Sequence, residues 1–180
     1  MAVTFFGLGL HVMTAIWIGT GHPFGGGILL LVAAVCDALD GALARRTGRT
    51  SRFGAFLDST IDRIAETVVL GGIAAYFLGR GGRADDVWAV MALVALGGSL
   101  ITSYTRARAE GLGLECKVGT FERPERVALT VAGLLVGHAA LVIAIGVLAL
   151  LSWLTVYQRV RHVQRLLERQ ALDAGPADKP

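Results

Sequence analysis

The chain has 180 residues, of which 54% are hydrophobic and only 17% are charged, with a formal net charge of +3. Soluble domains carry about 25% charged residues, so the composition argues against a soluble globular fold and against a disordered or collagen-like chain. Two cysteines are too few for a disulfide scaffold. A polytopic membrane protein remains, with a single domain expected over residues 1–170 and a disordered cytoplasmic tail over residues 171–180.

Six apolar stretches follow one another along the chain, separated by glycine, proline and charged residues. Their lengths are typical of spanning helices rather than strands, so we expect an all-α fold with six transmembrane helices. The stretches cover residues 3–19, 24–44, 55–78, 87–105, 127–137 and 139–156. The first lacks a basic leader and a small-residue cleavage site, so it is interpreted as a mature helix rather than a signal peptide. The last two are nearly continuous and leave open one long tilted helix, with Gly137 and His138 offering a turn.

The basic residues are unevenly distributed along this six-helix arrangement. If the N-terminus is cytoplasmic, every lysine and arginine except Arg80 and Arg83 falls on the cytoplasmic side. Five helices would instead place the arginines of residues 159–169 outside, so the positive-inside rule favours six. Anionic lipid headgroups account for the net positive charge. We therefore expect a multi-pass protein of the cell membrane that contacts membrane lipids and binds no nucleic acid.

Four carboxylates lie at helical spacing in two consecutive predicted helices. Asp37 and Asp40 are three residues apart, and Asp58 and Asp62 are four residues apart. Each costs a few kcal/mol at membrane depth, which indicates a function. If the two helices pack as a hairpin the carboxylates converge, and their mutual repulsion requires a cation between them. Oxygen ligands favour Mg²⁺, which leaves coordination positions for substrate phosphates, whereas zinc would require His or Cys at ligand spacing.

The residues around these acids are suited to a phosphorylated ligand. Gly41, Ala44 and Gly54 lack bulk and allow a ligand or a partner helix to approach the backbone. Arg45 supplies a planar cation that fits a phosphate. Together with metal-binding carboxylates in a membrane protein, this pattern predicts a lipid substrate that carries a diphosphate.

A proton or cation transporter is the alternative from another functional class, because transporters also line their paths with intramembrane carboxylates. The four acids, however, fall at the expected cytoplasmic ends of their helices rather than at the midplane. The sequence also has no visible inverted repeat, which many transporters contain. An enzyme is therefore favoured.

The run D-x-x-D-G-x-x-A-R at residues 37–45, followed by G-x-x-x-D-x-x-x-D at residues 54–62, resembles the signature of the CDP-alcohol phosphotransferase family at every position. The resemblance implies transfer of a phosphatidyl group from CDP-diacylglycerol to an alcohol, with release of CMP. It also implies a homodimeric enzyme that uses two divalent ions, Mg²⁺ or Mn²⁺. It implies that Asp62 is the general base and that the metal ligands are Asp37, Asp40, Asp58 and Asp62. The CDP-lipid contacts implied are Gly41, Ala44, Arg45, Ser51 (with Thr50 as the alternative hydroxyl), Gly54, and Thr4, which matches the end of a loop that precedes the first helix in the family.

A second pattern bears on the acceptor alcohol. S-Y-T-R-A-R-A-E at residues 103–110 and E-R-P-E-R at residues 122–126 resemble the branch of the family whose acceptor is inositol phosphate. That branch often has lysine at the position of Arg106. The resemblance implies an acceptor-phosphate pocket of Ser103, Arg106, Arg108, Arg123 and one of Arg159 or Arg161. Glycerol 3-phosphate, which would give phosphatidylglycerophosphate, is the alternative acceptor, since both acceptors carry a phosphate. The same arginines could also serve only as positive-inside anchors.

Overall fold

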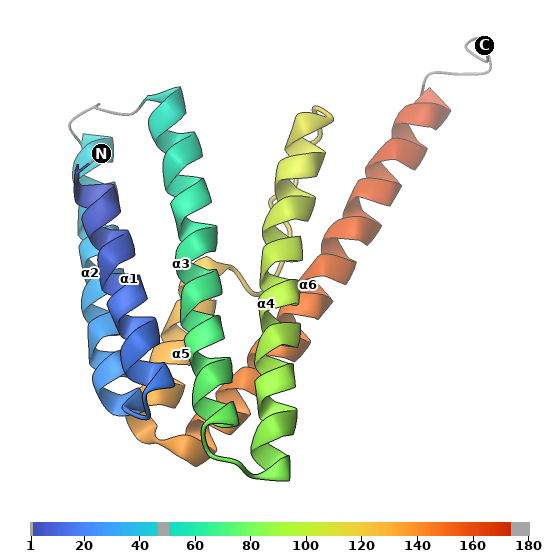
Figure 1. Ribbon diagram of the computed structural model, residues 1–180. Helices are drawn as coiled ribbons and strands as arrows, with labels where there is room; N and C mark the ends of the chain where they lie inside the picture. Colours follow the sequence, from blue (N-terminus) through green and yellow to red (C-terminus); the bar gives the residue numbers. More distant parts are fainter. Residues whose placement is uncertain (1, 47–50, 174–180) are drawn as a thin grey trace.

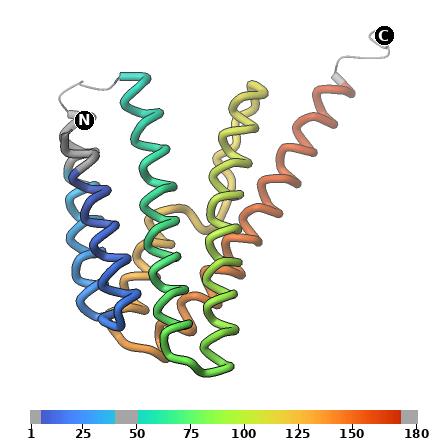
Figure 2. Tube along the Cα trace, viewed as in Figure 1, coloured from blue at the N-terminus to red at the C-terminus, as the bar shows by residue number. Residues whose placement is uncertain are grey.

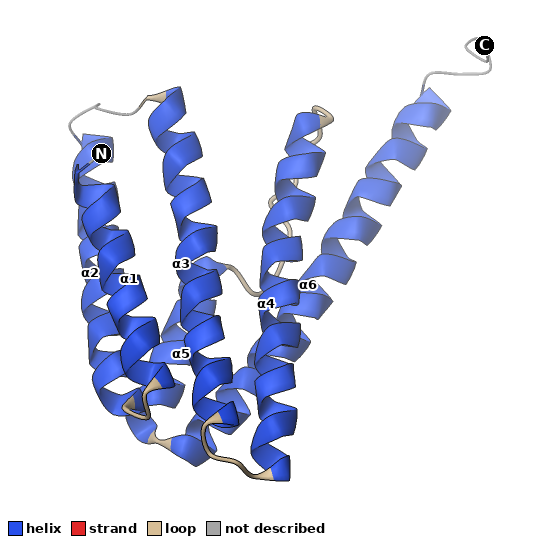
Figure 3. Ribbon diagram, in the orientation of Figure 1, coloured by secondary structure: helices blue, strands red, loops and turns tan. Residues whose placement is uncertain are grey.

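The computed structural model describes the backbone of residues 2–46 and 51–173 and the side chains of residues 6–39 and 51–172. The described residues form six α-helices and no strand (Figure 3), which confirms the predicted all-α class and the number of helices. The helices are α1 (Ala2–Gly19), α2 (Pro23–Arg46), α3 (Arg52–Leu78), α4 (Arg83–Gly111), α5 (Arg123–Val136) and α6 (His138–Asp173).

The helices pack as a ring. Each one contacts two principal neighbours, in the cyclic order α1, α2, α5, α6, α4, α3. Figure 1 shows the tight α1–α2, α3–α4 and α5–α6 turns at one end of the bundle. The end of α2, the start of α3 and the end of α6 lie at the opposite end in Figure 1, and the trace in Figure 2 shows the start of α3 and the last turns of α6 there. The predicted carboxylates therefore belong to the end opposite the three tight turns.

Aliphatic and aromatic side chains from around the ring fill its interior, among them Ile18, Leu30, Phe77 and Leu134. The contact between α1 and α3 is particularly close at Gly72. A Cβ atom at this position would lie 2.5 Å from the backbone oxygen of Ala15, which is less than a real Cβ contact allows. Only glycine therefore permits α1 and α3 to pack at this separation.

The boundary between α5 and α6 shows that residues 127–156 form two helices rather than one long helix. Gly137 has φ +127°, a backbone conformation that favours glycine, and it separates the two helices. One continuous helix over residues 127–156 is therefore wrong. With 14 residues, α5 is about 21 Å long, which is shorter than a hydrocarbon core of about 30 Å.

Several helices extend beyond the apolar stretches that predicted them. α4 continues to Gly111 and α6 to Asp173, where the sequence predicted ends near residues 105 and 156. Charged and polar residues at these ends are good helix formers, and Arg106 pairs with Glu110 one turn later. Hydropathy indicates where an apolar stretch ends, which is not where the helix ends. Of the predicted tail, residues 174–180 lie outside the described part of the chain.

Two helices are long and apolar enough to cross a membrane, among the residues that the structure describes: Arg83–Gly111 and His138–Leu172. Shorter apolar helical segments cover Phe6–Gly19 and Pro23–Leu39. Large apolar side chains also point outward from several helices. Examples are Ile16, Trp17, Leu31, Val35, Val90, Leu93, Ile143 and Leu150. Apolar exposure on this scale is typical of a surface that is not in contact with water.

Candidate active site

Two of the predicted carboxylates meet at one guanidinium group. Asp37 of α2 and Asp62 of α3 both face Arg123, the first residue of α5. The Nη2 atom of Arg123 lies 2.7 Å from Asp62 Oδ1 and 3.7 Å from Asp37 Oδ2. Arg63 Nη1 lies 3.6 Å from the other oxygen of Asp62. Two cations therefore balance the charge of Asp62, whose side chain is only 18% exposed.

The carboxylates do not approach each other in the way that the sequence predicted. α2 and α3 are not principal neighbours in the ring, because α1 lies between them and contacts both. Buried Gly7 of α1 makes room for Asp37, since a Cβ atom on Gly7 would lie 3.2 Å from Asp37 Oδ1. The direct α2–α3 hairpin that would bring the acids together is thus replaced by a three-helix arrangement, and α5 supplies the arginine that joins Asp37 and Asp62.

Of the other two predicted metal ligands, only Asp58 has a side chain that the structure describes. Asp58 is exposed and lies one turn before Asp62 on α3, whereas the side chain of Asp40 lies outside the described residues. Among the described side chains, no group of three or more acidic, histidine or cysteine residues is close enough to hold a metal ion. The donor chemistry nevertheless fits a hard divalent cation, because carboxylate oxygens from two helices surround a position that already attracts positive charge.

Among the predicted CDP-lipid contacts, Ser51 and Gly54 form the start of α3. Ser51 is the N-cap, and its Oγ accepts a hydrogen bond of 2.9 Å from the backbone N–H of Gly54. Their side chains or backbone are exposed, so they remain accessible to a ligand. The side chains of the other predicted contacts lie outside the described residues: Thr4, Gly41, Ala44, Thr50 and Arg45.

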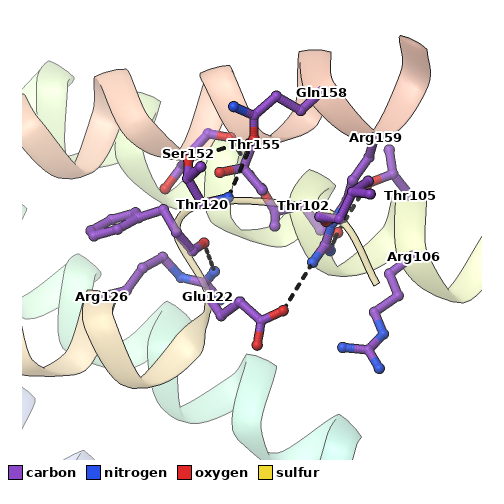
Figure 4. Close-up of polar contacts among 12 residues, drawn as sticks. Thr102, Thr105, Arg106, Thr120, Glu122, Arg126, Ser152, Thr155, Gln158 and Arg159 are labelled. Atoms are coloured by element: carbon purple, nitrogen blue, oxygen red, sulfur yellow. Dashed lines mark hydrogen bonds and ion pairs between the residues drawn. The ribbon is translucent and has the colours of Figure 1, made fainter. Parts of the chain in front are cut away.

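Arg159 is the buried member of the predicted acceptor pocket. Its guanidinium donates hydrogen bonds to the backbone oxygens of Thr102 and, at 2.9 Å, of Val118. Nη2 lies 3.9 Å from Glu122 Oε1, as drawn in Figure 4. Arg161 is exposed, so between these two alternatives Arg159 is the arginine that points into the protein.

The remaining acceptor candidates do not join Arg159 in one cluster. Ser103 is half-buried on α4, and Arg106 Nε lies 2.9 Å from Glu110 Oε1. Arg108 is exposed, two residues further along the same helix. Arg123 lies instead with the carboxylates. Among the described side chains, the predicted pocket is therefore divided between the acid site and the α4–α6 contact.

Behind the carboxylates lies a buried ion pair between Arg126 and Glu66, neither of which is among the predicted site residues. Arg126 Nε lies 2.9 Å from Glu66 Oε1, and Arg126 Nη1 donates a hydrogen bond of 3.3 Å to the Phe121 oxygen. The spacing in the sequence could have indicated it. Glu66 follows Asp62 by four residues, so the two acids share one face of α3, and Arg126 follows Arg123 by three, so the two arginines share one face of α5. Both ion pairs line a cavity whose other polar residues are His11 and Thr130.

The amino-acid sequence is similar to those of known enzymes over most of its length. The chain is 42% identical over 153 residues to the archaetidylinositol phosphate synthase of Methanothermobacter thermautotrophicus, covering 82% of this chain and 74% of the relative. It is 40% identical over 179 residues to the phosphatidylinositol phosphate synthase of Cutibacterium acnes, covering 92% and 86%.

The fold matches crystal structures of the phosphatidylinositol phosphate synthase of Mycobacterium tuberculosis. The structure with CDP-DAG bound has a TM-score of 0.80 at 33% identity and covers 90% of this chain and 84% of that one. The structure with manganese and citrate has a TM-score of 0.82 at 34% identity, with coverage of 90% and 80%. A sequence profile of the CDP-alcohol phosphatidyltransferase family matches residues 1–164. The chain therefore belongs to the CDP-alcohol phosphatidyltransferase family and is an enzyme of that class.

Proposed function

We propose that this enzyme transfers the phosphatidyl group of CDP-diacylglycerol to a hydroxyl group of inositol phosphate, giving phosphatidylinositol phosphate and CMP. The observation that carries the proposal is the meeting of Asp37 and Asp62 at Arg123, which gathers acidic and basic groups at one end of the bundle. Both relatives above are named for products that contain inositol phosphate, and the CDP-DAG complex of the mycobacterial protein supports the choice of donor.

The metal ligands in this proposal are the four signature aspartates, Asp37, Asp40, Asp58 and Asp62. They would hold two divalent ions, Mg²⁺ or Mn²⁺, and the manganese in the mycobacterial structure supports this type of cofactor. When bound, such ions stabilise negative charge on a diphosphate and on a phosphate leaving group. Hard carboxylate oxygens are the ligands that both ions prefer.

Asp62 is the general base in this proposal. One of its carboxylate oxygens accepts the proton of the acceptor hydroxyl while the hydroxyl oxygen attacks the lipid-linked phosphorus. The bond between this phosphorus and the CMP oxygen then breaks, and CMP leaves. Among the described aspartates of the site, Asp62 has the least exposed side chain, at 18% against 38% for Asp37, and it pairs with Arg123 at the start of α5.

In this proposal the CDP-lipid and the acceptor contact different sets of residues near the carboxylates. The CDP-lipid contacts proposed are Thr4, Gly41, Ala44, Arg45, Ser51 and Gly54. On the acceptor side we propose Ser103, Arg106, Arg123 and Arg159. Arg108 and Arg161 are less suited, because both are exposed. A guanidinium group binds phosphate through paired N–H donors, which supports arginine in these positions.

The outward apolar side chains support a position within the membrane, with all six helices at least partly embedded. The arginine-rich end that holds the carboxylates would face the cytoplasm. We also propose a homodimer, which size-exclusion chromatography with light scattering in detergent would test.

The decisive experiment measures CMP release from CDP-diacylglycerol by the purified enzyme with Mg²⁺. Inositol phosphate, glycerol 3-phosphate, inositol and serine are offered in turn, and an archaeal CDP-ether lipid replaces the donor in a parallel series. We expect the fastest release with inositol phosphate. A preference for glycerol 3-phosphate would reassign the enzyme to phosphatidylglycerophosphate synthesis, and a preference for inositol or serine would refute a phosphorylated acceptor.

A further inference from the structure

We propose that Arg123 couples metal binding to acceptor binding: its guanidinium pairs with the metal-binding carboxylates, is displaced by the divalent ion, and then binds the acceptor phosphate. This inference rests on the proposed function and concerns how its two binding events depend on each other.

The first argument is competition for the same oxygen atoms. One nitrogen of Arg123 lies 2.7 Å from Asp62 Oδ1 and 3.7 Å from Asp37 Oδ2, although the two acids belong to different helices. A divalent ion bound to the same two oxygens, Asp62 Oδ1 and Asp37 Oδ2, would compete with the guanidinium for them. Two cations this close repel each other strongly at low dielectric constant. Arg123 and the ion therefore cannot both hold these oxygens.

The second argument concerns which part of Arg123 can move. Its helix is anchored one turn later by the buried pair of Arg126 with Glu66 and by the hydrogen bond from Arg126 to the Phe121 oxygen. The start of α5 is therefore fixed against α3. The side chain of Arg123 is itself 32% exposed, so rotation about its side-chain bonds can relocate the charge without moving the helix.

The third argument is the location of the neighbouring residue. Glu122, directly before Arg123, lies 3.9 Å from the Arg159 guanidinium at the α4–α6 contact. Figure 4 shows Glu122 directed toward Arg159, in the same loop before α5 that contains Thr120. The backbone of Arg123 thus lies between the acid site and the proposed acceptor pocket, and a phosphate held in that pocket would attract the displaced guanidinium.

Coupling of this kind is reciprocal. If the ion frees Arg123 for phosphate, then phosphate bound to Arg123 must raise the affinity for the ion by the same factor. An acceptor that lacks phosphate should have no such effect. The enzyme would then bind its metal and its acceptor cooperatively, which disfavours a metal-loaded site without acceptor.

The test is Mn²⁺ binding, followed by electron paramagnetic resonance, to the purified full chain in lipid nanodiscs. In the wild type we expect inositol phosphate to tighten Mn²⁺ binding by about fivefold or more, and inositol to have no effect. Arg123→Gln should bind Mn²⁺ more tightly than the wild type when no acceptor is present, and inositol phosphate should then change the affinity less than twofold. Arg123→Lys, which keeps the charge, should stay close to the wild type. Arg165→Gln removes the same charge from an exposed position of α6 and is the matched control.

The outcomes separate this inference from the function on which it rests. If Asp62→Asn leaves Mn²⁺ binding unchanged, or if the wild type binds no Mn²⁺, the proposed metal site is wrong and the coupling falls with it. If Asp62→Asn weakens binding but Arg123→Gln does not tighten it, the metal site stands and the coupling through Arg123 is refuted. Equal affinities with and without inositol phosphate in the wild type would also refute the coupling.

Discussion

The guanidinium of Arg126 and the carboxylate of Glu66 lie 2.9 Å apart, with side chains only 4% and 12% exposed, and they join α5 to α3 one turn behind Asp62. A buried pair of this kind adds little stability compared with apolar residues of the same size. Removing one partner is costly, however, because it leaves an unpaired charge in a region with few water molecules. We infer that the pair holds α5 in register with α3, so that Arg123 faces Asp62.

Glu66→Leu should lower the free energy of unfolding by about 3–5 kcal/mol, because Arg126 would remain buried without its counter-charge. The double substitution Glu66→Leu with Arg126→Met removes both charges and should recover most of that loss. Unfolding in detergent, monitored by circular dichroism, measures both variants. Glu110→Gln at the exposed Arg106–Glu110 pair is the comparison and should cost less than about 1 kcal/mol. If the double variant is no more stable than Glu66→Leu, the unpaired-charge explanation is wrong.

Gly72→Ala should destabilise the bundle by about 1–3 kcal/mol, because the added Cβ would lie 2.5 Å from the Ala15 oxygen and force α1 away from α3. Gly71→Ala is a matched control one residue away, where a Cβ atom would meet nothing within 4 Å. Alanine is the better helix former by about 1 kcal/mol, so Gly71→Ala should leave stability unchanged or raise it. Thermal unfolding of the two variants side by side checks the prediction, and equal melting temperatures would contradict the close approach of α1 and α3.

Asp62→Asn should abolish CMP release while leaving CDP-diacylglycerol binding largely intact. The loss should be at least about 10²-fold, the contribution typical of a general base. Turnover and binding of the CDP-lipid are measured on the same preparation, and Asp86→Asn, an exposed acid in the first turn of α4, is the control. Wild-type turnover in Asp62→Asn would show that the base has been assigned wrongly.

Arg159→Gln should raise the KM for inositol phosphate by about tenfold or more, since a charge-assisted contact to phosphate contributes about 1.5–3 kcal/mol. The KM for CDP-diacylglycerol should stay within twofold. Arg161→Gln tests the alternative that the sequence left open, and because Arg161 is exposed we expect less than a twofold change. Steady-state kinetics with each substrate varied in turn measures both effects. A larger effect at Arg161 than at Arg159 would reverse the choice between them.

Much of the fold could be predicted because a membrane-compatible helix needs a long apolar stretch, and such stretches are visible in the sequence. All six predicted helices are present in the structure. Their ends were less predictable: α4 and α6 continue through charged residues that form helix readily outside an apolar environment. The break at Gly137 depends on a backbone conformation that composition does not reveal, so the sequence is also compatible with one long helix over residues 127–156.

For the site, the sequence by itself determined the chemistry: carboxylates at helical spacing, an arginine-rich end and a family signature that together indicate metal-dependent phosphatidyl transfer. Helical periodicity is local, and it therefore places Asp58 and Asp62 on one face without any knowledge of neighbours. Only the tertiary structure decided that α1 separates α2 from α3, that Arg123 lies with Asp37 and Asp62 rather than with Arg159, and that Arg126 is buried against Glu66. These pairings join residues from 60 positions apart (Glu66 and Arg126) to 86 positions apart (Asp37 and Arg123), and they follow from how the helices pack, which no local pattern specifies.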